Sequence, residues 1–142
     1  WQNVTKTLLT GVDILKINVN ELKTLTSQDD MLEAVKRCFD TYPIRMALAL
    51  TDGSANAFLF TQDHAWRYRL PDIDSVDNPI GAGDTVSAVF CCEILKRTPL
   101  EWAYASALAA GSASCLTHEP AFFDPTICEQ LKSKIEFEPI PF

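Results

Sequence analysis

Two short apolar runs separated by one amphipathic helix pattern constrain the fold of this chain most strongly. Residues 12–17 have the length of a buried strand and lead into the polar residues 18–21. Apolar side chains then recur at helical spacing over residues 27–42, where Ser27 is expected to cap the helix. Residues 45–50 alternate in a second strand pattern. This strand, helix, strand order predicts an α/β layer architecture.

The rest of the chain continues the mixed pattern. Residues 57–60 and 65–70 predict a strand pair, and residues 81–97 predict a helix. Residues 98–116 predict another helix, opened by a Thr98–Glu101 capping box, and residues 124–135 predict a last one that starts at Asp-Pro. Because no internal repeat or linker interrupts the 142 residues, we expect residues 1–142 to belong to a single domain.

Composition excludes several classes of function. A formal charge of -7 opposes contact with a polyanion, so we expect no nucleic-acid partner. No apolar run approaches the roughly 20 residues that span a bilayer, so we expect no membrane partner and a cytoplasmic location. The five cysteines are odd in number and form no C-x-x-C pair, which predicts reduced, mostly buried thiols.

The strongest local signal for chemistry is Asn78-Pro79-Ile80-Gly81-Ala82-Gly83-Asp84-Thr85, in which three small residues run into the start of a predicted helix. Small residues let an anion reach the backbone N–H groups of the first turn, where the helix dipole is positive. The sequence is neither a P-loop nor a G-x-G-x-x-G fingerprint. Spacing alone leaves two interpretations open: an anion site, or a tight turn followed by an acidic residue in a first helical turn.

This G-A-G-D core followed by a helix resembles the C-terminal signature of ribokinase-like (PfkB) carbohydrate kinases. The resemblance implies that Asp84 is the catalytic base that takes the proton of the substrate hydroxyl. It also implies that Gly81, Ala82 and Gly83 form an anion hole for the transferred phosphoryl group. The preceding Asn78-Pro79 is more similar to the phosphosugar branch of the family, which puts the aspartate of a monovalent-cation site in doubt.

Asn18-Val19-Asn20-Glu21 resembles the N-x-x-E motif of the same family and follows a predicted strand, as it does there. The resemblance implies that Glu21 organises Mg²⁺, mostly through water, and that Asn18 lies near the nucleotide phosphates. Taken alone, the motif fits equally well an Asn N-cap with Glu at position N3 of a short helix.

Two further segments resemble the nucleotide site. Thr51 and Gly53 match a T-x-G-x-x-G turn that approaches the phosphates and ribose, although Asn56 replaces its second glycine. Asparagine tolerates a left-handed conformation, so we expect the turn to survive. Ala109 and Ser112 belong to a helix face of small residues where relatives enclose adenine, and close helix packing explains such a face as well.

Together these segments are similar to the second half of a family member and predict a layered ribokinase-like fold with an incomplete central sheet flanked by helices. The implied function is an ATP-dependent phosphotransferase that uses Mg²⁺ and acts on a hydroxyl of a sugar or sugar phosphate. A catalytically silent nucleotide-binding remnant and a nucleoside kinase remain alternatives. Because Trp1 leads directly into strand-like sequence, we expect an N-terminal portion to be missing and this chain alone to be a poor enzyme. The resemblance allows a homodimer of the full-length protein and does not determine the oligomeric state.

Overall fold

The computed structural model describes residues 7–73 and 75–142, so Trp1 lies outside the described residues. Five strands form a sheet in the order β1-β2-β3-β4-β5, which confirms the α/β class. The chain clusters into two compact units. The first unit comprises Trp1–Gly53, Ala57–Arg67 and Pro139–Phe142, and the second comprises Ser54–Asn56 and Tyr68–Glu138.

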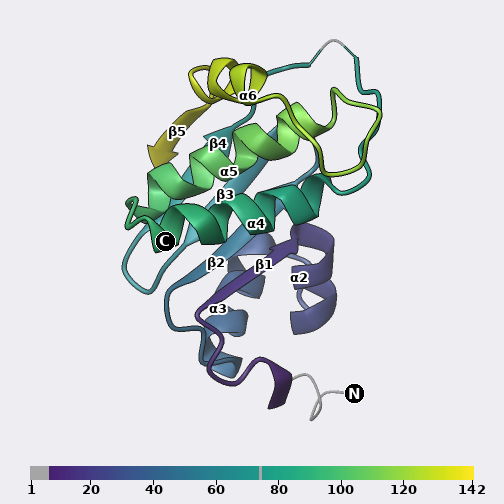
Figure 1. The fold of residues 1–142 in the computed structure, drawn as a ribbon. Helices are drawn as coiled ribbons and strands as arrows, with labels where there is room; N and C mark the ends of the chain where they lie inside the picture. Colours follow the sequence, from purple (N-terminus) through teal and green to yellow (C-terminus); the bar gives the residue numbers. More distant parts are fainter. Residues whose placement is uncertain (1–6, 74) are drawn as a thin grey trace. The chain divides into compact units, whose positions relative to one another are not determined.

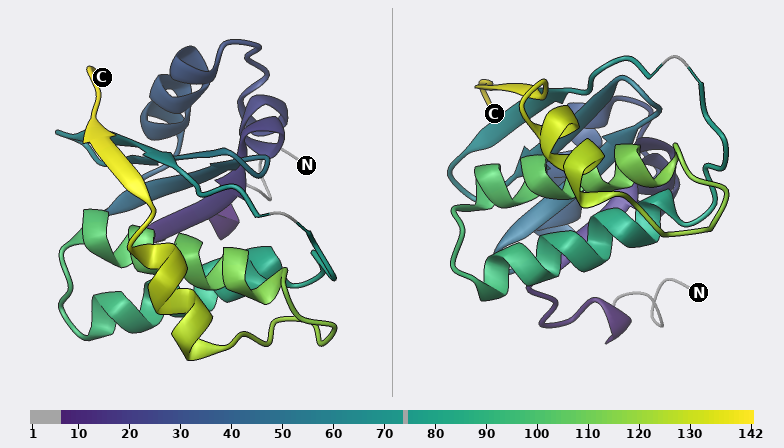
Figure 2. Two further views of the ribbon diagram at one scale, coloured as in Figure 1. Left: turned by 90° about the horizontal axis from the view of Figure 1, so that it is seen from above. Right: turned by 45° about the horizontal axis from the view of Figure 1, so that its top comes forward.

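The first unit is built on the expected pair of strands. β1 (Ile14–Asn18) and β2 (Ala47–Asp52) are parallel, with Asn18 opposite Thr51 at their carboxyl ends. Helices α2 (Val19–Thr26) and α3 (Met31–Thr41) lie side by side on one face of these strands (Figure 2). Parallel strands need such a crossover connection. The predicted strand 45–50 shifts by two residues in the structure.

The core of the first unit corrects one detail of the sequence prediction. The predicted alternation would bury every second residue of β2, but Ala47, Leu48, Ala49 and Leu50 are all fully buried. A continuous buried run is typical of a parallel strand that is covered on both faces. Further buried residues of this core come from the helices and neighbouring strands: Val19, Leu22, Ala34, Val35, Cys38, Tyr42, Ile44, Phe60 and Ala65.

The N-cap of α3 differs from the predicted Ser27. Ser27 ends α2 in the left-handed conformation (φ 55°), because the short helix α2 occupies the residues before it. Asp30 is the N-cap of α3, and its side chain accepts a hydrogen bond from the backbone N–H of Glu33 at 3.0 Å. The helix is therefore shorter than the predicted 27–42.

The predicted strand pair is present as β3 (Asn56–Phe60) and β4 (Ala65–Arg69). The hydroxyl of Thr61 accepts hydrogen bonds from the N–H groups of Asp63 (3.3 Å) and His64 (2.9 Å) and thereby closes their turn. A short strand that the sequence did not predict, β5 (Glu136–Pro139), follows the last helix.

In the second unit α4 (Ala82–Leu95) and α5 (Leu100–Ser114) run side by side, and α6 (Pro125–Lys132) packs on α5 (Figure 1). Asp124 caps α6 as predicted. The predicted capping box at α5 is wrong: Pro99 is the N-cap and forms no side-chain hydrogen bond. The Thr98 hydroxyl instead donates to the Glu93 carboxylate at 2.9 Å, and hydrogen bonds to charged acceptors are the stronger ones.

Two expectations from composition can be compared with the structure. All five cysteines are free thiols, but the expectation that most are buried is wrong: Cys38 is buried, whereas Cys91 and Cys92 are exposed on α4. Burial raises the pKa of the Cys38 thiol to about 11. Within residues 7–73 and 75–142, no helix is both long enough and apolar enough to cross a bilayer.

Candidate functional site

The first turn of α4 carries the residues that the sequence singled out as catalytic. Gly81 is the N-cap and adopts a left-handed conformation (φ 84°), which glycine accepts at little cost. A Cβ at this position would lie 2.9 Å from the backbone nitrogen of Ala121, closer than real Cβ contacts. The position therefore requires glycine for its backbone angle and for the space around it.

The first turn of α4 has no side-chain cap, and of its N–H groups that of Ala82 donates to the carbonyl of Pro79 at 3.3 Å. Residues in a first helical turn have no carbonyl four positions earlier to accept their N–H groups, and the Gly81 cap supplies no side-chain acceptor. From position 85 onward the ladder is closed, since Thr85 donates both its N–H (2.9 Å) and its hydroxyl (3.0 Å) to the Gly81 carbonyl. Gly83 and Asp84 thus carry the first-turn N–H groups that are available to an anion.

Asp84 is the third residue of α4 and its side chain is solvent-exposed. An exposed carboxylate at a helix N-terminus is favoured by the helix dipole. It is also accessible to a substrate hydroxyl, which a general base must reach within hydrogen-bond distance. Asp84 thus lies in the same first helical turn as Gly83, and the anion hole stays a prediction.

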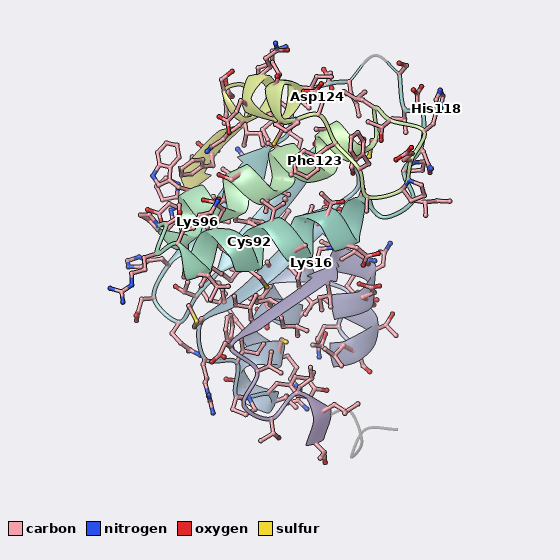
Figure 3. All side chains as sticks on the ribbon, in the orientation of Figure 1. Lys16, Cys92, Lys96, His118, Phe123 and Asp124 are labelled. Atoms are coloured by element: carbon pink, nitrogen blue, oxygen red, sulfur yellow. The ribbon has the colours of Figure 1, made fainter. Side chains whose placement is uncertain are left out.

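The loop before α4 is fastened to the loop between α5 and α6. The backbone N–H groups of Asp77 and Asn78 both donate to the carbonyl of Cys115, at 2.8 and 3.2 Å. The Asn78 side chain donates to the carbonyl of His118 at 3.0 Å and accepts from the N–H of Ile80 at 3.0 Å. Figure 3 shows His118 on this second loop. The start of α4 is therefore held by contacts outside the helix.

Gly111 of α5 brings the two helices close at the same end of α4. A Cβ at Gly111 would overlap the side chain of Val86 and would lie 3.2 Å from the carbonyl oxygen of Ala82. The small face of α5 was open to two interpretations, and at Gly111 it serves helix packing. The sequence indicated Gly111 on the small face and Asn78 in the segment before Asp84, but it predicted no role for either in the site, although an Asn-Pro pair commonly marks a turn.

In the first unit the N-x-x-E motif forms a complete capping box. The Glu21 N–H donates to Asn18 Oδ1 at 2.8 Å, and the Asn18 N–H donates to Glu21 Oε2 at 2.7 Å. The structural interpretation of this motif is thus confirmed. The second oxygen of the exposed Glu21 carboxylate has no hydrogen bond of its own in this box, so the metal role of Glu21 stays a prediction.

Glu21 fits a water-mediated contact with a magnesium ion, which is the contact that the family resemblance implies. Mg²⁺ keeps several waters and is commonly held by one or two carboxylates together with substrate phosphates. No group of three or more metal-binding side chains occurs among the residues that the structure describes. A single carboxylate that acts through water agrees with this chemistry, whereas an all-protein metal cage does not.

Thr51 and Gly53 lie at the carboxyl end of β2, where Thr51 is the register partner of Asn18. Gly53 is left-handed (φ 66°), as a tight turn requires, and open space surrounds its missing side chain. Asn56 does not have a positive φ and simply begins β3, so the turn persists for a different reason from the one expected. Open α/β sheets bind ligands at the carboxyl ends of their strands.

Ala109 and Ser112 are buried in α5, together with every residue from Ala103 to Ser114. Ala109 belongs to a core cluster with Ala113 and Leu131. Their contact with adenine stays a prediction. The structure thus groups the site residues in two sets: Asn18, Glu21, Thr51 and Gly53 in the first unit, and Gly81, Ala82, Gly83, Asp84, Ala109 and Ser112 in the second.

Solved structures of kinases share this fold. The chain superposes on a putative phosphofructokinase from Staphylococcus aureus with a TM-score of 0.84 at 18% identity, covering 97% of this chain and 45% of that one. It superposes on Arabidopsis thaliana ribokinase complexed with ribose and ATP with a TM-score of 0.79 at 24% identity, covering 89% and 43%. The fold is therefore ribokinase-like, as the sequence predicted.

Sequence comparison gives the family. Pyridoxal kinase PdxY of Vibrio parahaemolyticus is 28% identical over 104 residues, which cover 67% of this chain and 36% of that protein. The chain thus spans about a third of the length of this curated relative. The model of the pfkB family carbohydrate kinases matches residues 1–127. Because that match extends over most of the sequence, the chain belongs to the pfkB family of carbohydrate kinases.

Proposed function

We propose that this chain is the nucleotide-binding and catalytic part of an ATP-dependent, cytoplasmic kinase that phosphorylates a hydroxyl group of a sugar or sugar phosphate. The observation that carries the proposal is the first turn of α4, where a glycine cap without a side-chain acceptor leaves N–H groups beside an exposed carboxylate. Family membership supports the same reaction class.

The reaction assigns one task to each residue of that turn. Asp84 accepts the proton of the substrate hydroxyl. At the same time the hydroxyl oxygen bonds to the γ-phosphorus of ATP, and the bond between that phosphorus and the bridging oxygen of the β-phosphate breaks. The N–H groups of Gly81 and Gly83 stabilise the negative charge on the transferred group, and that of Ala82 joins them only when it leaves the Pro79 carbonyl, to which it donates at 3.3 Å. Bound nucleotide with Mg²⁺ supplies that group, and Glu21 orients water around the ion. Asn18, Thr51 and Gly53 position the phosphates, and Ala109 and Ser112 lie behind the adenine.

A second candidate substrate is a hydroxymethyl group of a pyridoxal-like ring. The observation that favours it is the identity to pyridoxal kinase over 104 residues. The base and the anion hole would be the same, because both reactions transfer a phosphoryl group to an alcohol. A nucleoside remains a third acceptor of the same class.

The test is a transfer assay with the full-length protein, ATP and Mg²⁺ against sugars, sugar phosphates, nucleosides and pyridoxal, with the Asp84→Asn variant in parallel. Transfer to one class of alcohol that disappears in the variant is the expected result. Nucleotide binding without transfer to any acceptor would favour the silent remnant instead.

A further inference from the structure

Asn78 lies in the loop before α4, and its side-chain amide forms two hydrogen bonds. Asn78 accepts the N–H of Ile80 through Oδ1 at 3.0 Å and donates from Nδ2 to the carbonyl of His118 at 3.0 Å. The two halves of one amide group therefore join the loop before α4 to the loop after α5. Both distances lie within the usual range of hydrogen bonds.

The loop that receives the Asn78 amide is itself ordered by a local hydroxyl. Thr117 Oγ1 lies 3.2 Å from the carbonyl of Ser114, 3.0 Å from that of Glu119 and 2.9 Å from that of Phe122. The single hydroxyl hydrogen can donate to only one of these carbonyls at a time, but all three lie around Thr117, so the loop turns around this side chain. The carbonyl of His118, which accepts from Asn78, therefore belongs to a loop whose backbone turns around Thr117.

The same loop contacts the residue at which α4 begins. Ala121 has a positive φ of 58°, and its backbone nitrogen lies 2.9 Å from where a Cβ of Gly81 would be. Gly81 therefore leaves no room for a side chain on the side that faces Ala121, so the loop lies close to the residue that precedes the first turn of α4.

We propose that Asn78 is a positioning residue for phosphoryl transfer: its amide sets the α5–α6 loop against Gly81 and so aims the N–H groups of Gly83 and Asp84. The inference rests on the proposed function of that turn. No hydrogen bond joins Asn78 to Asp84 among the described residues, so the role that we assign to Asn78 is positioning. Its two hydrogen bonds are exposed and contribute little to stability, so their main effect is geometric.

Asn78→Asp separates the two halves of the amide. The carboxylate keeps an oxygen for the Ile80 N–H but loses the donor to His118, and it places negative charge against a carbonyl oxygen. Gln62→Glu is the matched control, because it makes the same chemical change at an exposed residue in the β3–β4 turn. Both variants are made in the full-length protein.

Two measurements distinguish failure of the positioning role of Asn78 from failure of the proposed function. The first is amide hydrogen exchange at Thr85, whose N–H bonds to the Gly81 carbonyl at 2.9 Å and which needs no activity to be measured. The second is steady-state kinetics with the acceptor identified for the wild type. A misplaced anion hole acts on the transition state, so kcat should fall while KM for ATP changes little.

We expect Asn78→Asp to speed Thr85 exchange and to lower kcat by roughly 10-fold to 100-fold, whereas Gln62→Glu changes neither. Unchanged exchange at Thr85, or faster exchange with unchanged kcat, would overturn the positioning role. If the wild-type protein transfers no phosphate to any acceptor, the proposed function fails, and the positioning role fails with it even where Thr85 exchange responds.

Discussion

Two helices begin at motifs that resemble phosphate-site sequences, and their first turns differ. At α2 the Asn18 and Glu21 side chains satisfy each other's N–H groups at 2.8 and 2.7 Å. At α4 the Gly81 cap provides no side-chain acceptor. The first helix start is closed by its own side chains, whereas the second has no side-chain cap and its Ala82 N–H donates to the Pro79 carbonyl at 3.3 Å. A helix N-terminus that has already satisfied its donors is a poor anion site, so we expect anion binding at α4.

The largest expected effect belongs to the open helix start. Asp84→Asn keeps the size of the side chain and removes the proton acceptor, so kcat of the full-length kinase should fall at least about 100-fold. The nucleotide Kd and the melting temperature should change little, because asparagine is tolerated in a first helical turn. Steady-state kinetics and calorimetric titration on one preparation check this. A variant with near-normal kcat would remove Asp84 from the mechanism.

Gly81→Ala should destabilise the N-terminus of α4 through backbone strain. Its left-handed backbone and the close nitrogen of Ala121 predict a loss of unfolding free energy of roughly 1–3 kcal/mol, measured by denaturant titration. Gly53→Ala is the matched control, since Gly53 is also left-handed but has open space for a Cβ. An equal loss in both variants would mean that the contact with Ala121 contributes nothing.

Asn18→Ala tests the capping box at the start of α2. Removing an N-cap side chain costs about 1 kcal/mol, so the unfolding free energy should fall by that amount. Asp124→Ala at the N-cap of α6 should cost a similar amount. The two variants should differ in nucleotide affinity, which we expect only Asn18→Ala to weaken. Equal nucleotide affinity in both would reduce Asn18 to a structural cap.

The smallest change in stability is expected for Glu21→Gln. Glutamine can still accept the Asn18 N–H, so unfolding free energy should change by only a few tenths of a kcal/mol. The dependence of nucleotide affinity on Mg²⁺ should nevertheless weaken, because the negative charge that orders the water shell is lost. Titrations with and without Mg²⁺ measure it. Unchanged metal dependence would leave the capping box as the whole role of Glu21.

The sequence predicted most elements of the fold because their signals are local. Helical periodicity located α3, and the Asp-Pro start located α6. The errors arose where a neighbour altered a local preference: Glu93 binds the Thr98 hydroxyl that was expected to cap α5, and α2 uses Ser27 as its end. The strand β5 has only four residues, too few for a clear pattern.

Within the candidate site, the residue types were predictable from motifs and the supporting contacts were not. Gly81 and Asp84 follow from the G-A-G-D signature. The contacts of Gly81 with Ala121 and of Asn78 with His118 join residues about 40 positions apart, and no local pattern indicates them. Long-range packing therefore determines how accurately a correctly identified motif is oriented.

The central claim is that the open first turn of α4, and not that of α2, binds the phosphoryl group. The most direct measurement is backbone amide NMR of the full-length protein with Mg²⁺ and ADP–aluminium fluoride, which imitates the transferred group. We expect the N–H signals of Gly83 and Asp84 to move downfield and to exchange more slowly, while those of Asn18 and Glu21 keep their hydrogen-bonded positions. Slowed exchange at Asn18 and Glu21 with no change at Gly83 and Asp84 would contradict the account.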